Sequence, residues 1–253
     1  MAGAPTITPA LVVGALRYGD TSRIVRLVTR DHGLVSAIAK GALRPKSRFG
    51  AALQLLSEGQ AHLLPSRGEL HTLTAFDLTS LHGGLASDLR RFLAASALAE
   101  LAARFVPADP NPVLFDQLRD GLALLELTPP EAADVVGLRV LWRLVGDLGL
   151  APSLHGCARD GEPVDGDPVA FSFRDGGVLC ARCAHAGAVT RLAAEDLAAL
   201  VALAEGTADL PWLDARHAAA HRRLLARWIR SHLAEVELPA LAAWERGLET
   251  PTA

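Results

Sequence analysis

Three cysteines are the residues of this chain best suited to binding a metal ion. Cys180 and Cys183 form a Cys-x-x-Cys pair, and Cys157 precedes them in a segment rich in glycine, proline and aspartate. Two thiolates on such a tight turn can reach one zinc ion, which takes four ligands in a structural site. His155 and His185 are candidates for a further ligand. The alternative is a metal-free loop in which the cysteines pack as small apolar residues.

A second group of residues suits phosphate binding. The segment IAKGALRPKSRFG, residues 38–50, holds Lys40, Arg44, Lys46 and Arg48 without an acidic residue, and its two lysines are the only lysines of the chain. Cations on a Gly/Pro-rich loop can follow a nucleic-acid backbone without reading its sequence. The alternative is a solvated loop whose charges keep the domain soluble. The pooling of both lysines favours phosphate binding.

Arginines on the preceding segments can extend this basic surface. Arg17, Arg23 and Arg26 are predicted to belong to the same DNA-binding site, and Arg30 could join them, depending on which faces of their strands these arginines occupy. Aromatic rings are scarce here, with only Tyr18, Phe49 and Phe76. Tight single-strand binders usually add several stacking rings to a basic groove. Their scarcity favours a protein that holds backbones and leaves base edges free to pair, as strand annealing requires.

Positive charge is concentrated near the N-terminus. The formal net charge is −3, yet residues 1–50 hold eight basic and two acidic residues, which predicts a polyanion-binding surface at one end. The start lacks a basic region followed by an apolar core, and no apolar run free of charges reaches membrane-spanning length. Three cysteines with one Cys-x-x-Cys pair favour a reducing compartment. We therefore expect a cytoplasmic, nucleoid-associated protein.

Residues 8–80 are predicted to form short strands. Residues 11–19, 22–30, 33–41, 59–66 and 69–78 mix β-branched and apolar residues with alternation, and turn residues such as GD, DHG and RPKSRFG separate them. No run with a helical period of useful length interrupts the series. Five strands in so short a segment predict a small closed barrel, of which the OB-fold is the smallest common form.

The remainder is predicted to be helical. Helical periodicity begins with Ser87 as the expected N-cap and extends over 87–107, 111–127, 129–150, 192–206 and 214–236. Residues 151–190 lose this periodicity and become rich in glycine, proline and aspartate. The chain is thus predicted to be an α+β protein. Residues 1–80 form an OB-fold DNA-binding domain, and residues 81–253 form a helical domain whose insert, 151–190, contains the cysteines and is similar to a zinc knuckle.

The segment LRYGDTSRIVRLVTRDHGLVSAIAKGALRPKSRFGAALQ closely resembles the N-terminal block of the RecO family of bacterial recombination mediators. That family has a YGE-x-D turn, a TR-x-x-G hairpin and a KGARRPKSR segment in the same order. Here the turn reads YGD at residues 18–20, and residues 40–48 match nearly residue for residue. The cysteine segment and the helical remainder also fit, so the resemblance spans almost the full chain.

The resemblance implies an OB-fold, a helical domain with a zinc-binding insert, and a role in DNA repair. That role is to anneal single strands and, with the partner RecR, to help the recombinase RecA replace single-strand-binding protein. The family often has a second Cys-x-x-Cys followed by glycine upstream of the first. Here Asp160 stands where its fourth cysteine is expected. A carboxylate can ligate Zn²⁺, so the expected ligand set is Cys157, Asp160, Cys180 and Cys183.

The resemblance also implies that the helical domain binds the acidic, apolar-ended tail of single-strand-binding protein. In the helix expected at 214–236, Arg223, Arg227 and Arg230 follow Arg216 on one face, opposite apolar residues that include Trp228. An apolar floor with an arginine rim would suit such a tail. The alternative is an ordinary amphipathic core helix with a solvated arginine face.

Two other functional classes are open to this sequence. A protein-binding OB module would use the basic face for an acidic protein, and its binding would not share the salt dependence of DNA-backbone binding. A metal-dependent nucleic-acid enzyme would need ligand or general-base motifs. However, the nine histidines form no HExxH motif, the pair His217 and His221 lacks the glutamate, and the deaminase pattern is missing. There is also no Walker A motif. We therefore expect a non-enzymatic protein, and any zinc to be structural.

Overall fold

The computed structural model describes residues 4–66, 68–185, 189–206, 209–233 and 237–247. The chain divides into two compact units, residues 1–133 and 134–253, and each is described by itself. None of the helices in the described ranges combines the length and the apolar character that a membrane crossing needs.

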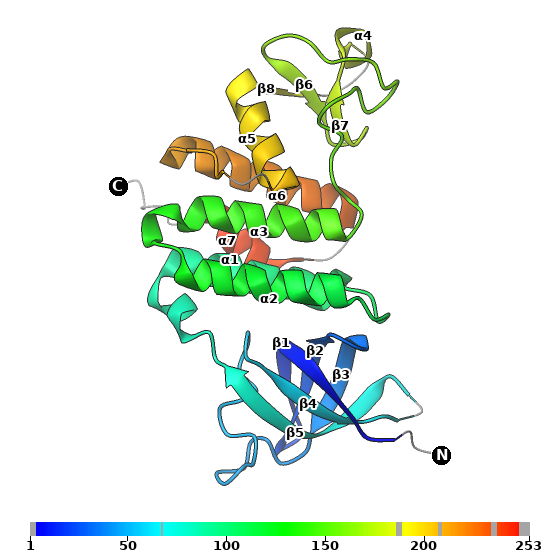
Figure 1. The fold of residues 1–253 in the computed structure, drawn as a ribbon, viewed down its shortest axis with the longest axis vertical. Helices are drawn as coiled ribbons and strands as arrows, with labels where there is room; N and C mark the ends of the chain where they lie inside the picture. Colours follow the sequence, from blue (N-terminus) through cyan, green and yellow to red (C-terminus); the bar gives the residue numbers. More distant parts are fainter. Residues whose placement is uncertain (1–3, 67, 186–188, 207–208, 234–236, 248–253) are drawn as a thin grey trace. The chain divides into compact units, whose positions relative to one another are not determined.

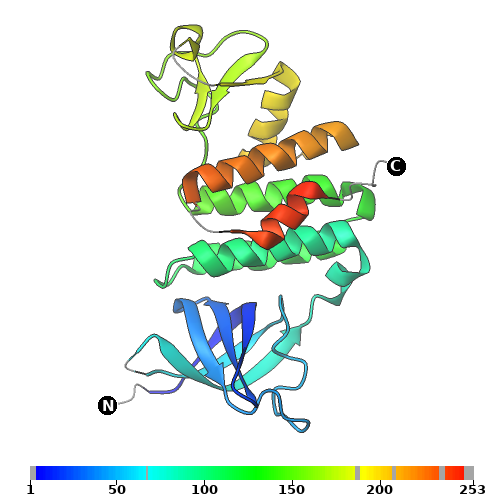
Figure 2. The same ribbon diagram turned by 180° about the vertical axis from the view of Figure 1, so that it is seen from behind.

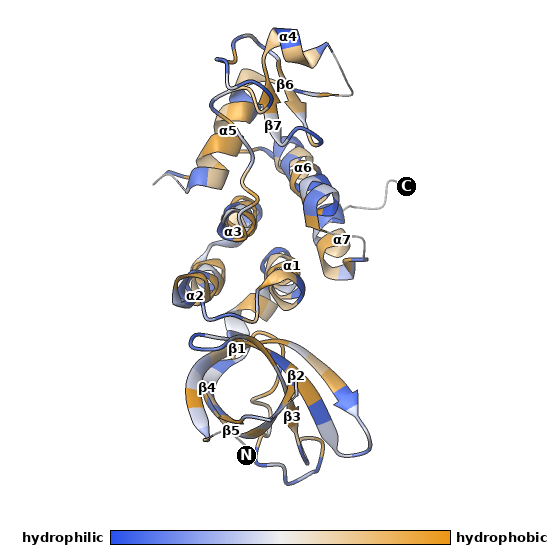
Figure 3. Cartoon of the chain, turned by 90° about the vertical axis from the view of Figure 1, so that its right-hand side faces the viewer, coloured by the Kyte–Doolittle hydropathy of each residue, from blue (hydrophilic) through white to orange (hydrophobic). Residues whose placement is uncertain are grey.

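The first unit begins with a closed five-stranded barrel (Figure 1). Its strands are β1 (Thr6–Tyr18), β2 (Ser22–Thr29), β3 (Gly33–Ala39), β4 (Glu58–Leu64) and β5 (Leu70–Ser80). They follow the order β1-β2-β3-β5-β4 around the barrel, and only β3 and β5 pair in parallel. Figure 3 shows the ring of strands nearly end-on. The predicted five-stranded OB-like barrel is confirmed, and residues 22–39 form a β-hairpin, as their turn chemistry indicated.

Alternation along the strands builds the barrel core. Val25 and Leu27 of β2 pair with Ala37 and Val35 of β3, and all four side chains belong to one buried cluster. The loop after β3 adds Phe49 and Leu53 to the same cluster, which fixes an irregular segment to the barrel. Figure 2 shows the first part of this loop in light blue at the end of the barrel farther from the two helices of this unit, whereas Leu56, near the end of the loop, lines a small pocket with residues of both helices.

Two α-helices complete the first unit. They are α1 (Leu89–Phe105) and α2 (Pro112–Leu127), flanked by the short 3-10 helices η1 (Gly83–Ser87) and η2 (Pro130–Ala132). Asp88, not Ser87, caps α1: its side chain accepts hydrogen bonds from the backbone N–H groups of Arg90 and Arg91. The expected N-cap was wrong by one residue, because the Ser87 hydroxyl donates to the carbonyl of Gly84 inside η1.

The turn between β2 and β3 fixes the chain that follows α1. Gly33 has φ +63°, and a Cβ added there would lie 2.4 Å from the carbonyl oxygen of Asp109. The next residue, Leu34, donates its N–H to the carbonyl of Pro107 at 2.9 Å. Glycine is therefore required both by the left-handed backbone and by the close approach. This contact positions the end of α1 beside the β2–β3 hairpin.

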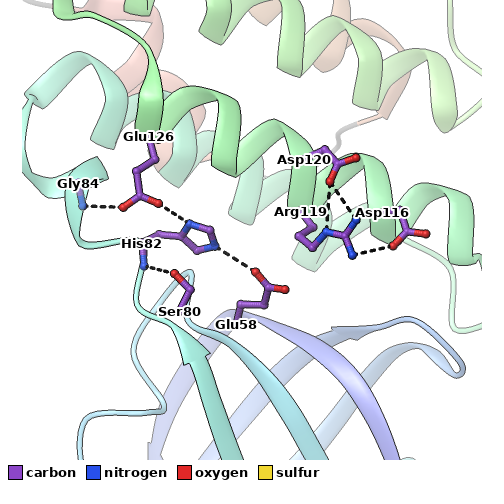
Figure 4. A network of polar contacts seen from close by, with 8 residues as sticks. All are labelled: Glu58, Ser80, His82, Gly84, Asp116, Arg119, Asp120 and Glu126. Carbon is purple, nitrogen blue, oxygen red and sulfur yellow. Dashed lines mark hydrogen bonds and ion pairs between the residues drawn. The ribbon is translucent and has the colours of Figure 1, made fainter.

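A buried histidine links the barrel to α2 (Figure 4). His82 follows β5 and is 6% exposed. Its Nδ1 lies 2.8 Å from Oε2 of Glu126 on α2, and its Nε2 lies 3.4 Å from Oε2 of Glu58 on β4. The other oxygen of Glu126 accepts the N–H of Gly84 at 2.8 Å. The network thus joins a strand, the linker and a helix of the first unit.

The second unit combines helices with a small antiparallel sheet. Its elements are α3 (Ala133–Asp147), β6 (Val169–Ser172), β7 (Gly177–Leu179), α4 (Ala181–Ala184), β8 (Thr190–Leu192), α5 (Ala194–Glu205), α6 (Ala215–Leu233) and α7 (Pro239–Arg246). Trp228 of α6 packs against Trp142 of α3 and Phe171 of β6, and its indole N–H donates to the carbonyl of Leu150 at 3.0 Å. Helix α7 packs beside α6 (Figure 2).

The sequence did not predict the sheet, α4 or α7. Strands β6 and β7 are buried at every residue and only four and three residues long, so they show no alternation. The sheet order is β7-β6-β8, and it lies largely within the segment predicted to be an insert. The domain boundary at residue 80 and the insert limits of 151–190 stay predictions.

Candidate nucleic-acid interface and metal centre

The basic loop, defined as residues 40–48, presents its cations to solvent. Lys40, Arg44, Lys46 and Arg48 are all exposed. Within the described part of the chain, none of these four side chains forms an ion pair. The guanidinium of Arg48 lies 5.1 Å from the centre of the Phe49 ring, which is itself buried in the barrel. Four positive charges are therefore held on an anchored loop.

Two arginines of the β1–β2 hairpin border this loop. Arg17 and Arg23 face each other across the strand pair, and the backbone N–H of Leu43 donates to the carbonyl of Thr21 at the hairpin turn. Arg23 Nη1 also donates to the carbonyl of Leu53 at 3.2 Å. The turn and the loop therefore form one basic surface at this end of the barrel.

The other arginines of this region lie elsewhere. Arg26 occupies the face of β2 opposite to Val25 and Leu27, beside α1 rather than the loop. Arg30 forms an ion pair with Asp116 of α2 at 3.5 Å. Of the predicted DNA-binding set, six residues belong to the loop and the adjoining hairpin, and Arg26 is separate.

The four predicted metal ligands lie together. Oδ2 of Asp160 is 3.0 Å from Sγ of Cys183 and 3.6 Å from Sγ of Cys180. One ligand atom from each of these residues and Cys157 lies within 4.8 Å of the others. Bonds of about 2.3 Å to sulfur and about 2.0–2.2 Å to oxygen place these atoms about 3.5–3.8 Å apart around a tetrahedral zinc ion. The donor set and its spacing fit such an ion.

Local backbone structure positions these ligands. Cys157 begins a turn in which the N–H of Gly161 donates to the Cys157 carbonyl at 2.8 Å, and Gly161 has φ +75°. Cys180 precedes α4, and the N–H of Ala184 donates to its carbonyl at 3.0 Å. All three thiols are buried. Two short turns thus converge on one point from segments about 20 residues apart in the chain.

The electrostatics of the cluster favour a cation. Hydrogen bonds from the thiols of Cys183 and Cys157, and then from Arg182, hold the pKa of Asp160 well below its usual range. In turn, the Asp160 carboxylate, and then burial, raise the pKa of Cys183 to about 12. Burial also acts to raise the pKa of Cys157, but the backbone N–H groups of Cys180, Arg159 and Asp160 outweigh it and lower that pKa. A divalent ion could replace the protons that these groups share.

Two arginines contact the cluster, and the sequence analysis did not identify either of them. Arg182 Nη2 lies 2.9 Å from Oδ2 of Asp160. Arg159 donates to the carbonyl of Cys183 at 3.2 Å and forms an ion pair with Asp175 at 2.9 Å. A sequence feature that could have identified these arginines is the tripeptide Cys-Ala-Arg, which occurs in both turns. His155 instead bonds to Glu205, and neither it nor His185 joins the ligand cluster found among the described residues.

Comparison with known proteins places both halves of the chain in one family. The family model described as "Recombination protein O N terminal" matches residues 1–82, and the one described as "Recombination protein O C terminal" matches residues 86–242. The chain belongs to the RecO family. On this chain, the boundary between the two matched regions falls directly after β5. The C-terminal match contains all four candidate metal ligands.

Several RecO relatives cover most of the chain, and each is named "DNA repair protein RecO". The relative from Anaeromyxobacter dehalogenans strain 2CP-C is 38% identical over 78% of this chain and 78% of its own length. The one from Exiguobacterium sp. is 37% identical over 76% of this chain and 75% of the relative. The one from Pelobacter propionicus is 34% identical over 72% and 74%.

The arginines predicted to bind a RecO partner lie on α6. Arg227 stacks its guanidinium 4.1 Å from the centre of the Phe173 ring, and Arg230 forms an ion pair with Glu245 of α7. Arg223 is exposed on the same helix. Two of the three side chains therefore already make contacts within the second unit, and their assignment to a partner stays a prediction.

Proposed function

We propose that this chain is a DNA repair protein that binds the backbone of single- and double-stranded DNA through its basic loop. The observation that carries the proposal is the group of four exposed cations, none of them ion-paired among the described residues, on a loop anchored by Phe49. Unpaired exposed cations can release counterions from a phosphate backbone without reading its sequence. The names of the relatives support a role in DNA repair.

Strand annealing is the activity that best suits this surface. Of the three aromatic rings of the barrel domain, Phe49 and Phe76 are buried, and Tyr18 is exposed. A surface with one available ring holds bases weakly compared with binders that stack several. It would therefore grip phosphates and leave base edges free to pair with a complementary strand.

The proposed role in the cell is that of a mediator rather than an enzyme. Together with RecR, the protein would help the recombinase RecA load on DNA coated by single-strand-binding protein. Support for these partners comes from membership of the RecO family. We infer further that the cluster of Cys157, Asp160, Cys180 and Cys183 binds one structural zinc ion, because three thiolates and a carboxylate suit zinc better than magnesium or calcium.

A salt series with a matched control tests DNA binding. One variant replaces Lys40, Arg44, Lys46 and Arg48 by alanine. The control loses the same charge from exposed arginines of the second unit, with Arg174, Arg191, Arg216 and Arg246 replaced. The loop variant should lose affinity for oligonucleotides of different sequence alike. Its slope of log K against log salt should flatten by up to about 3 on single strands, at about 0.7 per phosphate contact.

The same proteins should be compared in a fluorescence assay of strand annealing. The loop variant should anneal complementary strands more slowly than the wild type, whereas the control variant should not. Equal DNA binding by the loop variant and the wild type would place the DNA site elsewhere. Binding of an acidic protein without any DNA binding by the wild type would favour the protein-binding alternative.

A further inference from the structure

A second concentration of positive charge lies in the first unit, away from the basic loop. Arg26 on β2 and Arg104 in the last turn of α1 line one pocket of 600 Å³. His32, Ser36 and His71 also line it. A pocket of this size can hold one nucleotide-sized group.

The two arginines lack acidic partners. Neither forms an ion pair within the described ranges, and Nε of Arg26 is buried without a hydrogen-bond partner. Burial, and then the positive charge of Arg104, lower the pKa of Arg26. Glu69 is the carboxylate of the lining, but it pairs with neither arginine there. The pocket thus holds two positive charges against one carboxylate, and neither arginine has an ion-pair partner among the described residues; a bound anion would relieve their repulsion.

The fold holds these charges together. The Gly33 turn and the hydrogen bond from Leu34 to Pro107 fix the end of α1 at the β2–β3 hairpin. The side chain of Arg26 extends over Gly14 of β1, where even an added Cβ would only be in ordinary van der Waals contact with it, 3.6 Å from the Arg26 Cβ. The arrangement is therefore built from strands and a helix rather than from a mobile surface loop. Such preorganised donors lose little entropy when an anion binds.

Two further polar side chains of the lining, His71 and Ser36, can donate hydrogen bonds. The backbone N–H of Ser66 donates to Nδ1 of His71 at 3.3 Å, so the neutral imidazole carries its proton on Nε2. Ser36, which pairs with Arg26 across the β2–β3 ladder, adds a hydroxyl. Guanidinium groups bind the tetrahedral oxygens of phosphate in bidentate fashion, and two of them match the charge of a phosphate dianion.

We propose that the pocket between Arg26 and Arg104 binds a phosphate group of DNA, as a site separate from the basic loop. The inference deepens the proposed function and rests on it for the identity of the ligand. The phosphate could belong to the end of a strand, to an internal phosphodiester or to free inorganic phosphate. The experiment separates these sources.

The first measurement uses inorganic phosphate and the full chain. Phosphate should raise the melting temperature of the wild type by a few degrees relative to chloride at equal ionic strength. Arg104→Gln should abolish this shift. Arg104→Glu should abolish it too, while its own melting temperature in chloride stays equal or rises, because it gives Arg26 an acidic partner. Arg119→Gln, a charge-matched change on α2, should keep the shift.

The second measurement uses single strands with and without a 5′ or 3′ phosphate. If a strand end is bound, the phosphorylated strand should bind the wild type about tenfold more tightly, and Arg104→Gln should remove this preference. If an internal phosphate is bound, Arg104→Gln should weaken both strands alike and flatten the salt slope by about 0.7. If both Arg104 variants lose the rise in melting temperature that phosphate causes, but bind DNA as tightly as the wild type, the pocket binds free phosphate.

The inference fails if the wild type binds DNA, but Arg104→Gln and Arg104→Glu change neither the phosphate shift nor DNA affinity. It also fails if an acidic peptide, and not phosphate, binds the pocket. Failure of the proposed function can be told apart from failure of this inference. In that case the wild type and the basic-loop variant would bind DNA equally weakly, whether or not phosphate raises the melting temperature.

Discussion

Replacement of Asp160 tests whether the cysteine cluster is a four-ligand zinc site. The three thiols and the carboxylate have ligand atoms within 4.8 Å of one another, and the distances from Oδ2 of Asp160 to Sγ of Cys183 and Cys180, 3.0 and 3.6 Å, bracket the value of about 3.5 Å expected around zinc. Asp160→Ala removes one ligand and should weaken zinc binding at least about tenfold, or about 1.4 kcal/mol. Asp160→Cys supplies a softer ligand and should strengthen it.

Zinc affinity should appear directly as stability. Because zinc binds the folded state preferentially, a tenfold change in affinity changes the free energy of unfolding by about 1.4 kcal/mol in excess zinc. For a unit the size of residues 134–253, this corresponds to a shift in melting temperature of about 5 °C. Asp160→Ala should lower the melting temperature in zinc by at least about this amount, and Asp160→Cys should raise it. Without zinc, after treatment with a chelator, these zinc-dependent differences should disappear.

The assay combines metal analysis, competition with a chromophoric zinc chelator and thermal unfolding. Asp165→Ala is the matched control, an exposed aspartate in the same segment outside the cluster. His155→Ala should leave zinc affinity unchanged, because His155 is bonded to Glu205. A wild type that holds no zinc after refolding with the metal would refute the site. Unchanged affinity in Asp160→Ala would make His155, His185 or water the fourth ligand.

Two further predictions concern the first unit. Gly33→Ala should lower the free energy of unfolding by at least about 1–3 kcal/mol in denaturant titrations, since φ is +63° and the Cβ would meet the Asp109 carbonyl; an unchanged midpoint would contradict the close approach. His82→Ala should lower the free energy of unfolding by about 1–3 kcal/mol, because Glu58 and Glu126 would lose the imidazole between them. If the effects of His82→Ala and Glu126→Gln on this free energy are fully additive in the double variant, the contact between the two side chains contributes nothing.

Local patterns were sufficient to predict the barrel. Buried residues alternate strictly along β3, Val25 and Leu27 of β2 are the matching inward residues, and turn residues separate the strands, so the strand signals are local. The cluster of candidate metal ligands was also predictable, because Cys180-x-x-Cys183 is a local motif and the family pattern pointed to Asp160. The short buried strands β6 and β7 carry no such signal, because every residue is buried and none alternates. The N-cap of α1 shifted by one residue because η1 uses Ser87 for its own hydrogen bond.

By itself, the sequence determined the residue types, their local periodicity and the loop that carries the lysines. Only the tertiary structure decided which arginines act together. The sequence leaves open which face of its strand Arg26 occupies, and the alternation of β2 turns it away from Arg23. Its neighbour is Arg104, which no local pattern connects with it. The physical reason is that charge is a property of residues, whereas charge density depends on distances, and the barrel and the docked end of α1 set those distances.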